Sequence, residues 1–561
     1  LQSVNLCAYA KKNAVLGPLW RLPLVTSMAL FLESCNLIPD HTGMADKRVL
    51  IIWNGTAGAG RQYVAAAMYL QEMGMTVSMV GPPDSNHLAK HFNLAYVCTS
   101  PSTQELLSRP SVVQACTAND YEAFERAFAL ENEAYTAGNI HVICQAIKGF
   151  EPELILVSTR LLHRVLTAGN ALGIPVLPLA LQEPNDVLGD ALEPAWATMK
   201  DSKIASLLTG ELESWGSSFE QALGVSPAAH FWPSVSQVQA LVGKAPQFPY
   251  LTLVNFDMLD IKVFNEIKGS SGAQVIGQVR EPETLPWSGE KKPRPTKVYA
   301  LGRIQLDTLQ ETYLPALYDR TEAQKLEEFI VRYQDGRNMS FCTDKILVYV
   351  SYGPVICRDV KFMTGLVLRA LMKVGFQAIV DASCGMSMDQ LSGEPDAGSL
   401  KEYIEENVFF VHKVPCTKFL SRCIFCLHDG NSSMIQRSLE MRTPSIITPI
   451  FGQQFENARR VADIDFGLVL PGMTRLSVDS FAAEMSTLKT IVRHKKISDS
   501  IIYPSLRHPL HDLTARVRFP NLLRQIWTEN IQDNKLLKDM DDIKADNGSC
   551  ARCCTTRRVQ P

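Results

Sequence analysis

The sequence predicts an α/β protein made of two Rossmann-like halves, and three observations support this fold class. The apolar run Val49–Trp53 is followed by a glycine turn and a helical pattern. A similar order of strand, helix and strand recurs from Glu153, and a third begins at the apolar run Lys345–Val350. Strands that alternate with helices favour a parallel sheet. A chain of 561 residues is also too long for one core, because a domain usually holds about 100–200 residues.

The elements of the first half can be placed from their glycines. The strand Val49–Trp53 runs into Asn54 and a turn that contains Gly55, Gly58 and Gly60, and an alanine-rich helix continues to Met73. Gly74 ends that helix, and a second strand covers Thr76–Val80. A later unit has the strand Glu153–Val157, a helix through Ala171 and a strand over Gly173–Leu177. These patterns predict βαβ units with ligands at the carboxyl ends of the strands.

The second half repeats the alternation. A helix is expected at Val360–Lys373, and a further helix at Asn521–Asn530 follows Pro520. Lys268–Thr296 is rich in Gly, Pro, Ser and charge and is typical of a linker. The strands that we expect after Lys345–Val350 are Phe376–Val380, Val408–His412, Ile424–Leu427 and Ser445–Thr448.

Composition excludes several classes of protein. Lys and Arg number 55 and Asp and Glu 58, so a net charge of −3 gives no electrostatic reason to expect binding to nucleic acid or to an anionic membrane. Fourteen cysteines are too few for a disulfide scaffold and fit a reducing compartment. We therefore expect a cytoplasmic protein with at most peripheral membrane contact.

The two ends differ from the rest of the chain. Residues 1–43 hold one apolar stretch, Leu22–Leu32, which is shorter than the ~20 residues that span a bilayer and resembles a signal peptide only in part. We expect 1–43 to be a leader outside the native protein, with Met44 as its start. Residues 536–561 are expected to be a disordered tail. Its Cys550, Cys553 and Cys554 lack a second ligand pair, so no metal site is predicted.

The glycine turn taken alone argues against two nucleotide-binding classes. Gly55, Gly58 and Gly60 are spaced G-x-x-G-x-G, whereas a dinucleotide site has G-x-G-x-x-G and an acidic residue after the second strand. Here that strand runs into Gly81 and two prolines. A P-loop motif is absent from the sequence as well.

The run from Val414 to Val461 carries a specific resemblance. Without a gap, it resembles the donor-binding signature of the UDP-dependent family 1 glycosyltransferases and is closest to their sterol glucosyltransferase branch. Asn54–Ala59 resembles the glycine turn of that branch, and Val350–Pro354 resembles its strand that ends in F-G-S. The resemblance covers roughly residues 47–490.

The resemblance implies a GT-B fold, in which two Rossmann-like domains face each other across a cleft. It implies an acceptor-binding domain at 44–303, a linker and connecting helix at 304–342, and a UDP-sugar domain at 343–510. A helix at 511–535 would cross back to the first domain. The implied reaction transfers a hexose from a UDP-sugar, which is a co-substrate and not a resident cofactor, to the hydroxyl of a sterol, a lipid or another small hydrophobic acceptor.

The family's donor-binding positions map onto this chain. They are Gly58, Ser351, Gly353, Cys384, Pro415, His428, Asp429, Gly430, Ser432, Ser433, Gln453 and Gln454.

Several of these positions differ from the family pattern. The base that would take the acceptor's proton is replaced by Ala59, which cannot accept one. Glu183 and Asp186 are the only substitutes that the sequence offers. The family's paired histidines become His428 and Asp429, and a carboxylate repels a diphosphate unless it is protonated or turned away.

The remaining differences lie in the sugar and nucleobase sites. Gln453 stands where the family has an aspartate that holds the sugar, and Cys384 replaces an aromatic residue. Ser432 and Ser433 could still bind phosphate at the start of a helix. Two interpretations stay open: a divergent glycosyltransferase, or a non-catalytic GT-B homologue that binds a ligand or a partner.

Overall fold

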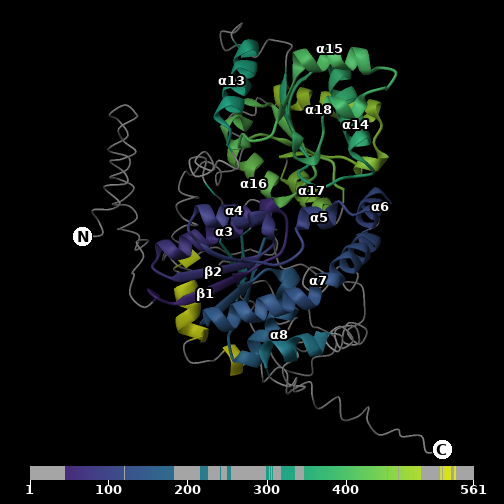
Figure 1. The fold of residues 1–561 in the computed structure, drawn as a ribbon. Coiled ribbons are helices and arrows are strands. Elements are labelled where there is room, and N and C mark those ends of the chain that lie inside the picture. Colours follow the sequence, from purple (N-terminus) through teal and green to yellow (C-terminus); the bar gives the residue numbers. More distant parts are fainter. Residues whose placement is uncertain are drawn as a thin grey trace, which may run out of the picture.

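The fold was analysed in a computed structural model. It describes residues 44–118, 121–181, 215–224, 249–253, 298–301, 318–334, 346–450, 453–464, 466–494, 519–520, 522–531 and 536–538, with the single residues 241, 304 and 306. Figure 1 shows two α/β bodies stacked one above the other, the lower built mainly from the first part of the chain and the upper from the later part. The leader, the linker Lys268–Thr296 and most of the predicted tail lie outside the described residues.

The lower body contains a seven-stranded sheet in the order β3-β2-β1-β4-β5-β6-β7. Every neighbouring pair is parallel. The central strands β1 and β4 are almost wholly buried, as expected for a sheet covered on both faces. The strands are β1 (Arg48–Ile52), β2 (Thr76–Gly81), β3 (Ala95–Cys98), β4 (Leu154–Val157), β5 (Val176–Ala180), β6 (Tyr250–Thr252) and β7 (Val298–Ala300).

Helices cover this sheet, and glycines end two of them. The helix α3 stops at Glu72 before Gly74, which has a φ of 84°. The helix before β5 ends at Gly173, with a φ of 64°, and β5 therefore starts at Val176, three residues later than the predicted Gly173. The helices are α3 (Ala57–Glu72), α4 (Asn86–His91), α5 (Thr103–Leu107), α6 (Pro110–Ala118), α7 (Tyr121–Phe150) and α8 (Leu162–Leu172).

The upper body contains a six-stranded parallel sheet in the order β10-β9-β8-β11-β12-β13. Its strands are β8 (Leu347–Ser351), β9 (Gln377–Asp381), β10 (Val408–Val411), β11 (Phe425–His428), β12 (Ser445–Ile447) and β13 (Gly467–Val469). Its helices are α13 (Arg320–Gln334), α14 (Val360–Val374), α15 (Ala397–Asn407), α16 (Ser432–Met441), α17 (Gln453–Asp463) and α18 (Val478–His494).

Short helical turns join many of these elements. They are η2 (Pro83–Ser85), η3 (Thr159–Leu161), η6 (Ala382–Cys384), η7 (Met388–Leu391), η8 (Cys416–Lys418), η9 (Leu420–Arg422), η10 (Met473–Arg475) and η11 (Trp527–Ile531).

Both sheets follow the Rossmann strand order, which confirms the predicted fold class. In the lower sheet β1 lies beside β4, and in the upper sheet β8 lies beside β11. The strands that precede each crossover extend the sheet on one side of this pair, and the strands that follow it extend the sheet on the other side. This reversal creates a switch point at which loops leave the two strands on opposite faces, and ligands of open α/β sheets bind there. The switch points lie between β1 and β4 and between β8 and β11.

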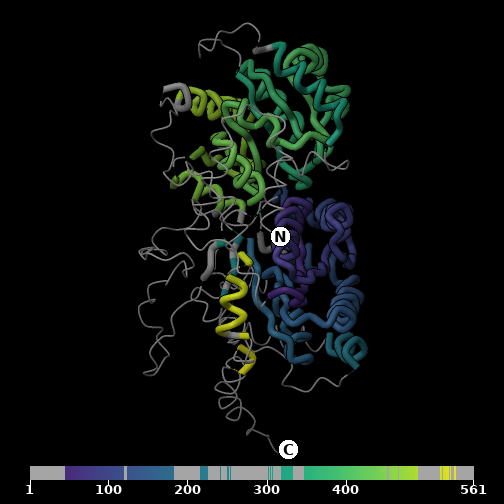
Figure 2. Tube along the Cα trace, turned by 90° about the vertical axis from the view of Figure 1, so that its left-hand side faces the viewer, coloured from purple at the N-terminus to yellow at the C-terminus, as the bar shows by residue number. Residues whose placement is uncertain are grey.

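Residues near the end of the chain return to the first half. Phe519, Leu523, Ile526 and Trp527 are buried in the same hydrophobic cluster as β1 and β4. The Lys47 Nζ atom lies 5.0 Å from the centre of the Trp527 ring. Figure 2 shows this segment, coloured yellow, alongside the lower body.

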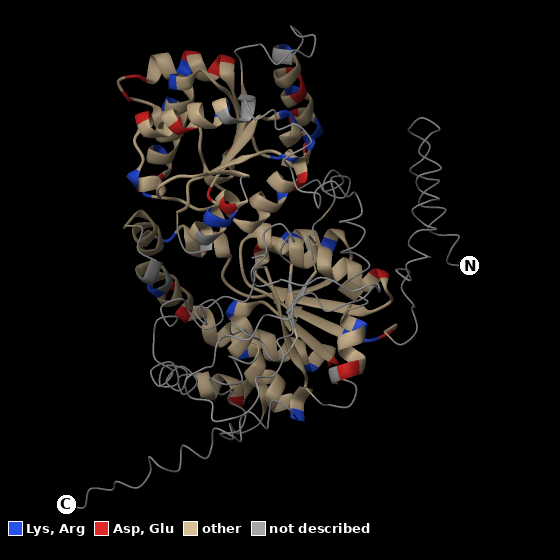
Figure 3. Cartoon of the chain, turned by 180° about the vertical axis from the view of Figure 1, so that it is seen from behind, with Lys and Arg blue, Asp and Glu red and all other residues tan. Residues whose placement is uncertain are grey.

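Charged side chains lie mainly on the helices and loops. Figure 3 shows blue and red residues interspersed over the helices of both bodies, with tan strands between them. Among the described residues, no helix combines the length and the apolar character that crossing a bilayer requires.

Candidate functional site at the facing loops

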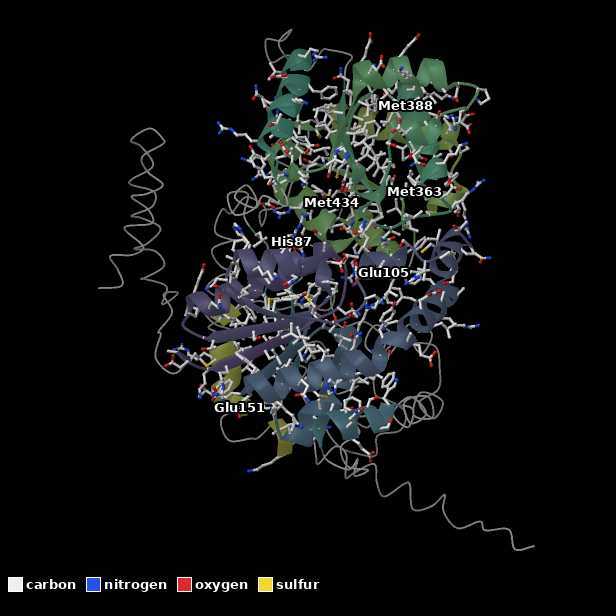
Figure 4. The ribbon with its side chains drawn as sticks, in the orientation of Figure 1. His87, Glu105, Glu151, Met363, Met388 and Met434 are labelled. Carbon is white, nitrogen blue, oxygen red and sulfur yellow. The ribbon has the colours of Figure 1, made fainter. Side chains whose placement is uncertain are left out.

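Two loops that leave switch-point strands face each other across the boundary between the bodies. One joins β1 to α3 and the other joins β11 to α16. A Cβ atom placed on Gly58 would lie 3.3 Å from the Cβ and 3.6 Å from the Oγ of Ser433. Figure 4 marks Met434, the next residue on α16, and His87 on α4 to either side of this boundary. The glycine turn therefore contacts the first turn of α16.

Ala59, which the resemblance predicts at the position of the family's base, lies in the first turn of α3. Its methyl group packs at the edge of the first-half core, 3.2 Å from the place where Gly55 would carry a Cβ. Asp84, on the loop after β2, accepts hydrogen bonds from Ser102 Oγ at 2.6 Å and Thr103 N at 2.9 Å. Both oxygens of Asp84 are thus engaged in fixing the start of α5.

The substitutes predicted for the missing base are not placed. Glu183 and Asp186 both lie outside the described residues. Their assignment stays a prediction.

His428 ends β11 and is completely buried. Its Nδ1 accepts a hydrogen bond from Gly430 N at 3.0 Å, so the proton of the neutral ring lies on Nε2. Nε2 lies 3.0 Å from Ser445 Oγ and donates to it, and that hydroxyl in turn bonds Ser438 Oγ at 3.2 Å. Burial lowers the pKa of His428 to about 3. Both ring nitrogens therefore serve internal bonds of a neutral imidazole.

Asp429 is also buried, and its carboxylate points into the protein. Oδ1 accepts from Asn431 N at 3.1 Å and Asn431 Nδ2 at 2.5 Å, and Oδ2 accepts from Gln454 Nε2 at 2.6 Å. Burial raises the pKa of Asp429 to about 6, while the bonds from Asn431 act in the opposite direction. The carboxylate is held by bonds inside the protein, and whether it would repel a diphosphate stays a prediction.

The start of α17 completes this polar network. Gln454 Oε1 accepts from Ile450 N at 2.8 Å, so each end of that amide has a bond within the protein. Asn457 Nδ2 donates to Gly430 O at 3.0 Å. Gln453 is the first residue of α17, and its side chain is not described. We refer to His428, Asp429, Asn431, Gln454 and Asn457 as the donor-loop network.

The first turn of α16 keeps features of an anion site. Asn431 is the N-cap, and its Oδ1 accepts from Met434 N at 2.9 Å. Ser432 and Ser433 follow, both half-buried, and no acidic residue lies in this turn. The positive end of the helix dipole is therefore not neutralised from within the turn.

The remaining predicted donor positions shape the sheet edge. Ser351 Oγ donates to Asp381 Oδ2 at 2.8 Å. Gly353 adopts a φ of 57°, and Pro415 is buried ahead of η8. Cys384 is buried, and burial raises the pKa of its thiol to about 11. These residues surround the carboxyl ends of β8 and β9, and an unreactive thiol replaces the predicted stacking group.

The structure brings together residues whose relation the sequence did not reveal. Asp429 and Gln454 belong to separate motifs, yet they are hydrogen-bonded, and Asn431, Ser445 and Asn457 complete their surroundings. The signal in the sequence was that Asp429 stands where the resemblance predicts a second histidine. Among the described residues, no group of His, Cys, Asp and Glu is arranged to hold a metal ion.

Comparisons with known proteins agree with this fold. No protein-family model matches the chain. A sterol 3-beta-glucosyltransferase of Kluyveromyces lactis is 27% identical over 158 residues, which are 28% of this chain and 13% of that protein. The enzyme of the same name from Saccharomyces cerevisiae is 26% identical over 226 residues, 38% of this chain and 18% of that protein. The matched regions thus span less than a fifth of these relatives.

A solved structure covers most of the chain. The crystal structure of CalG4, the calicheamicin glycosyltransferase, aligns with a TM-score of 0.50 and 14% identity over 87% of this chain and 99% of that one. This structure confirms the GT-B fold, and the sequence matches show similarity to sterol 3-beta-glucosyltransferases over parts of this chain.

Proposed function

We propose that this glycosyltransferase-like chain uses its GT-B fold to bind a ligand or a partner without transferring a sugar. The hydrogen bond from Gln454 to Asp429 carries the proposal. By resemblance, these two residues stand where a transferase holds the sugar and the diphosphate of its donor. Here they bind each other inside the protein, so neither is presented to a nucleotide sugar.

The chemistry of the reaction supports the same conclusion. Transfer to a hydroxyl needs a base, whose removal lowers the rate by about 10²–10⁴-fold, and Ala59 provides none. It also needs donors aimed at the leaving diphosphate. His428 is buried and neutral, and its one ring proton is bonded to Ser445.

A second candidate is the transfer of a hexose from a UDP-sugar to a sterol, lipid or other hydrophobic hydroxyl. The names of the relatives favour it. One structural observation favours it too: with Asp429 turned inward, the start of α16 offers Ser432, Ser433 and the helix dipole to a phosphate. Glu183 or Asp186 would then have to act as the base.

Two assays on the full chain separate these functions. Calorimetric titration with UDP and with UDP-glucose should show no micromolar binding. UDP release should stay at background when a mixture of sterols and lipid alcohols is added. Micromolar binding together with acceptor-dependent UDP release by the wild type would overturn the proposal and establish the second candidate.

Two variants at position 59 test whether sugar transfer is absent because the base is missing or because the donor loop does not bind a nucleotide. Ala59→Asp restores a carboxylate at the base position, and Ala59→Ser is a matched polar control that cannot act as a base. If the donor loop is closed to nucleotides, neither variant releases UDP. Acceptor-dependent release by Ala59→Asp alone would show that the donor site still works and that only the base is missing.

A further inference from the structure

We infer that the two halves form a single closed unit, because each half inserts side chains into the hydrophobic core of the other. This inference does not depend on whether the donor loop binds a nucleotide. It concerns two segments: α16 with its neighbours in the second half, and the segment from α5 to the start of α7 in the first half.

The first insertion runs from the second half into the first. Ile435 and Leu439 on α16, Ile447 on β12 and Val461 on α17 are all buried. They belong to the same continuous cluster as the strands β1 and β4. Figure 1 shows α16 and α17 at the lower edge of the upper body, next to α3, α4 and α5.

Buried hydrogen bonds fix α16 to the first half at Leu253 and to the segment that follows β7 at Leu306. Gln436 Nε2 donates to Leu253 O at 3.0 Å, and Arg437 Nη2 donates to Leu306 O at 3.1 Å. The Arg437 side chain is 4% exposed, and its Nη1 lies 3.2 Å from Glu440 Oε2. Separating the halves would leave a buried amide and a buried guanidinium without these acceptors, which is strongly unfavourable.

The second insertion runs in the opposite direction. Leu107 on α5, Val112 and Cys116 on α6, and Phe124 on α7 are buried in the cluster that forms the core of the second half. Their neighbours in that cluster include Val355, Met363 and the strand β8. The segment is anchored in its own half where Asp84 accepts from Ser102 and Thr103.

These two insertions have a conformational consequence. A hinge motion that opened the boundary would pull apolar side chains of both halves into water at once and break the bonds of Gln436 and Arg437. A boundary of this kind behaves as part of a core and not as a sliding surface. The closed arrangement is therefore present without any ligand.

Hydrogen exchange of the full chain tests the inference through Phe124→Ala. This change lies in the first half by sequence, yet it should accelerate exchange of the β8 and β11 amides of the second half about tenfold or more. Phe481→Ala, on α18 inside the second half and equally buried, gives the reference acceleration for those strands. Acceleration confined to α5, α6, α7 and the first sheet would overturn the inference.

A reciprocal variant tests the other insertion. Arg437→Met removes the bond to Leu306 and should speed exchange at Leu253 and β5 in the first half. Arg369→Met is the matched control, because Arg369 pairs with Glu394 and Asp396 within the second half. It should leave the first half unchanged. Equal effects of the two variants on β5 would contradict the inference, and Gln436→Ala replaces Arg437→Met if the latter does not fold.

Equilibrium unfolding gives an independent readout on the wild type. Urea transitions followed by exchange at β1 and at β8 should coincide. Two transitions separated in urea concentration would show that the halves unfold independently and would overturn the inference.

Discussion

The loop between β1 and α3 and the loop between β11 and α16 occupy equivalent places in their sheets, yet they are built differently. In the first, Thr56 is the N-cap and makes no side-chain bond to the helix. In the second, Asn431 caps the helix through Met434 N and also binds Asp429. One loop is shaped by its backbone, and the other is held by side chains.

Under the proposed function, this difference corresponds to two kinds of departure from the family pattern. At the glycine turn, Ala59 stands where the resemblance predicts the family's base, while the turn keeps its course into α3. In the donor-loop network, Asp429 accepts hydrogen bonds from Asn431 and Gln454, so the side chains bind one another. Ala59→Asp alone would supply a carboxylate at the first loop, whereas the second loop would need its internal hydrogen bonds broken before it could present Asp429 or Gln454 to a ligand.

Gly430→Ala and Gly58→Ala compare the two loops most sharply. Gly430 has a φ of 90°, and a Cβ there would lie 2.9 Å from Ile447 Cγ2 and 3.0 Å from Gln454 O. Backbone strain and overpacking together should lower the free energy of unfolding by about 3–5 kcal/mol. Gly58 lies in a helix, and a Cβ there would meet Ser433 Cβ at 3.3 Å and Thr56 Oγ1 at 3.7 Å, so its alanine variant should change stability by less than about 1 kcal/mol. Chemical denaturation measures both, and equal losses would refute the contrast.

Asp429→Asn tests the charge inside the donor-loop network through pH. Because the pKa of Asp429 is raised to about 6 by burial, the folded protein keeps a proton that the unfolded chain loses near pH 4. Wild-type stability therefore falls as pH rises through this range. The stability of Asp429→Asn relative to wild type should increase by about 3 kcal/mol between pH 4 and pH 8.

The titration of the neighbouring His428 does not change the stability difference between Asp429→Asn and wild type. The pKa of His428 is lowered to about 3, so its contribution to stability is lost as pH falls below about 6.5. This contribution has the opposite sign, and it cancels because both proteins carry His428. A difference between the two proteins that is flat from pH 4 to pH 8, measured by urea unfolding, would show that Asp429 is not a buried anion.

The helix caps give the smallest expected effect. Asn431→Ala removes the bond to Met434 N and should cost about 1 kcal/mol, or somewhat more because the bond to Asp429 is lost as well. Thr56→Ala should change the free energy of unfolding by only a few tenths of a kcal/mol, since its side chain makes no cap bond. Thermal unfolding of the two variants side by side measures the contrast. A loss at Thr56 as large as that at Asn431 would remove the distinction between the loops.

Local patterns were enough to predict most of the fold. Apolar runs placed β1, β8 and β11 within a residue or two, and Gly375 ends α14 near the predicted Lys373. The long helix α7 and the edge strand β3 were missed. The strand is mostly exposed and short, and α7 changes its buried partners along its length, so neither carries a clean apolar period.

The site was less predictable, for a physical reason. The resemblance assigned Asp429 and Gln454 to a diphosphate and a sugar, since each was compared with the family separately. Their hydrogen bond depends on how α17 approaches the loop after β11, which no local pattern encodes. The same holds for Arg437 and Leu306, whose contact joins α16 to the segment that follows β7.

The return of Phe519, Leu523 and Trp527 to the first half bears on the order of folding during synthesis. The ribosome completes β1, β4 and α3 long before it makes Phe519, Leu523 and Trp527, which belong to the same core. Until those residues emerge, the first half must expose the apolar surface that they later cover. Nascent chains of this protein should therefore depend on chaperones until translation has passed the segment around Trp527.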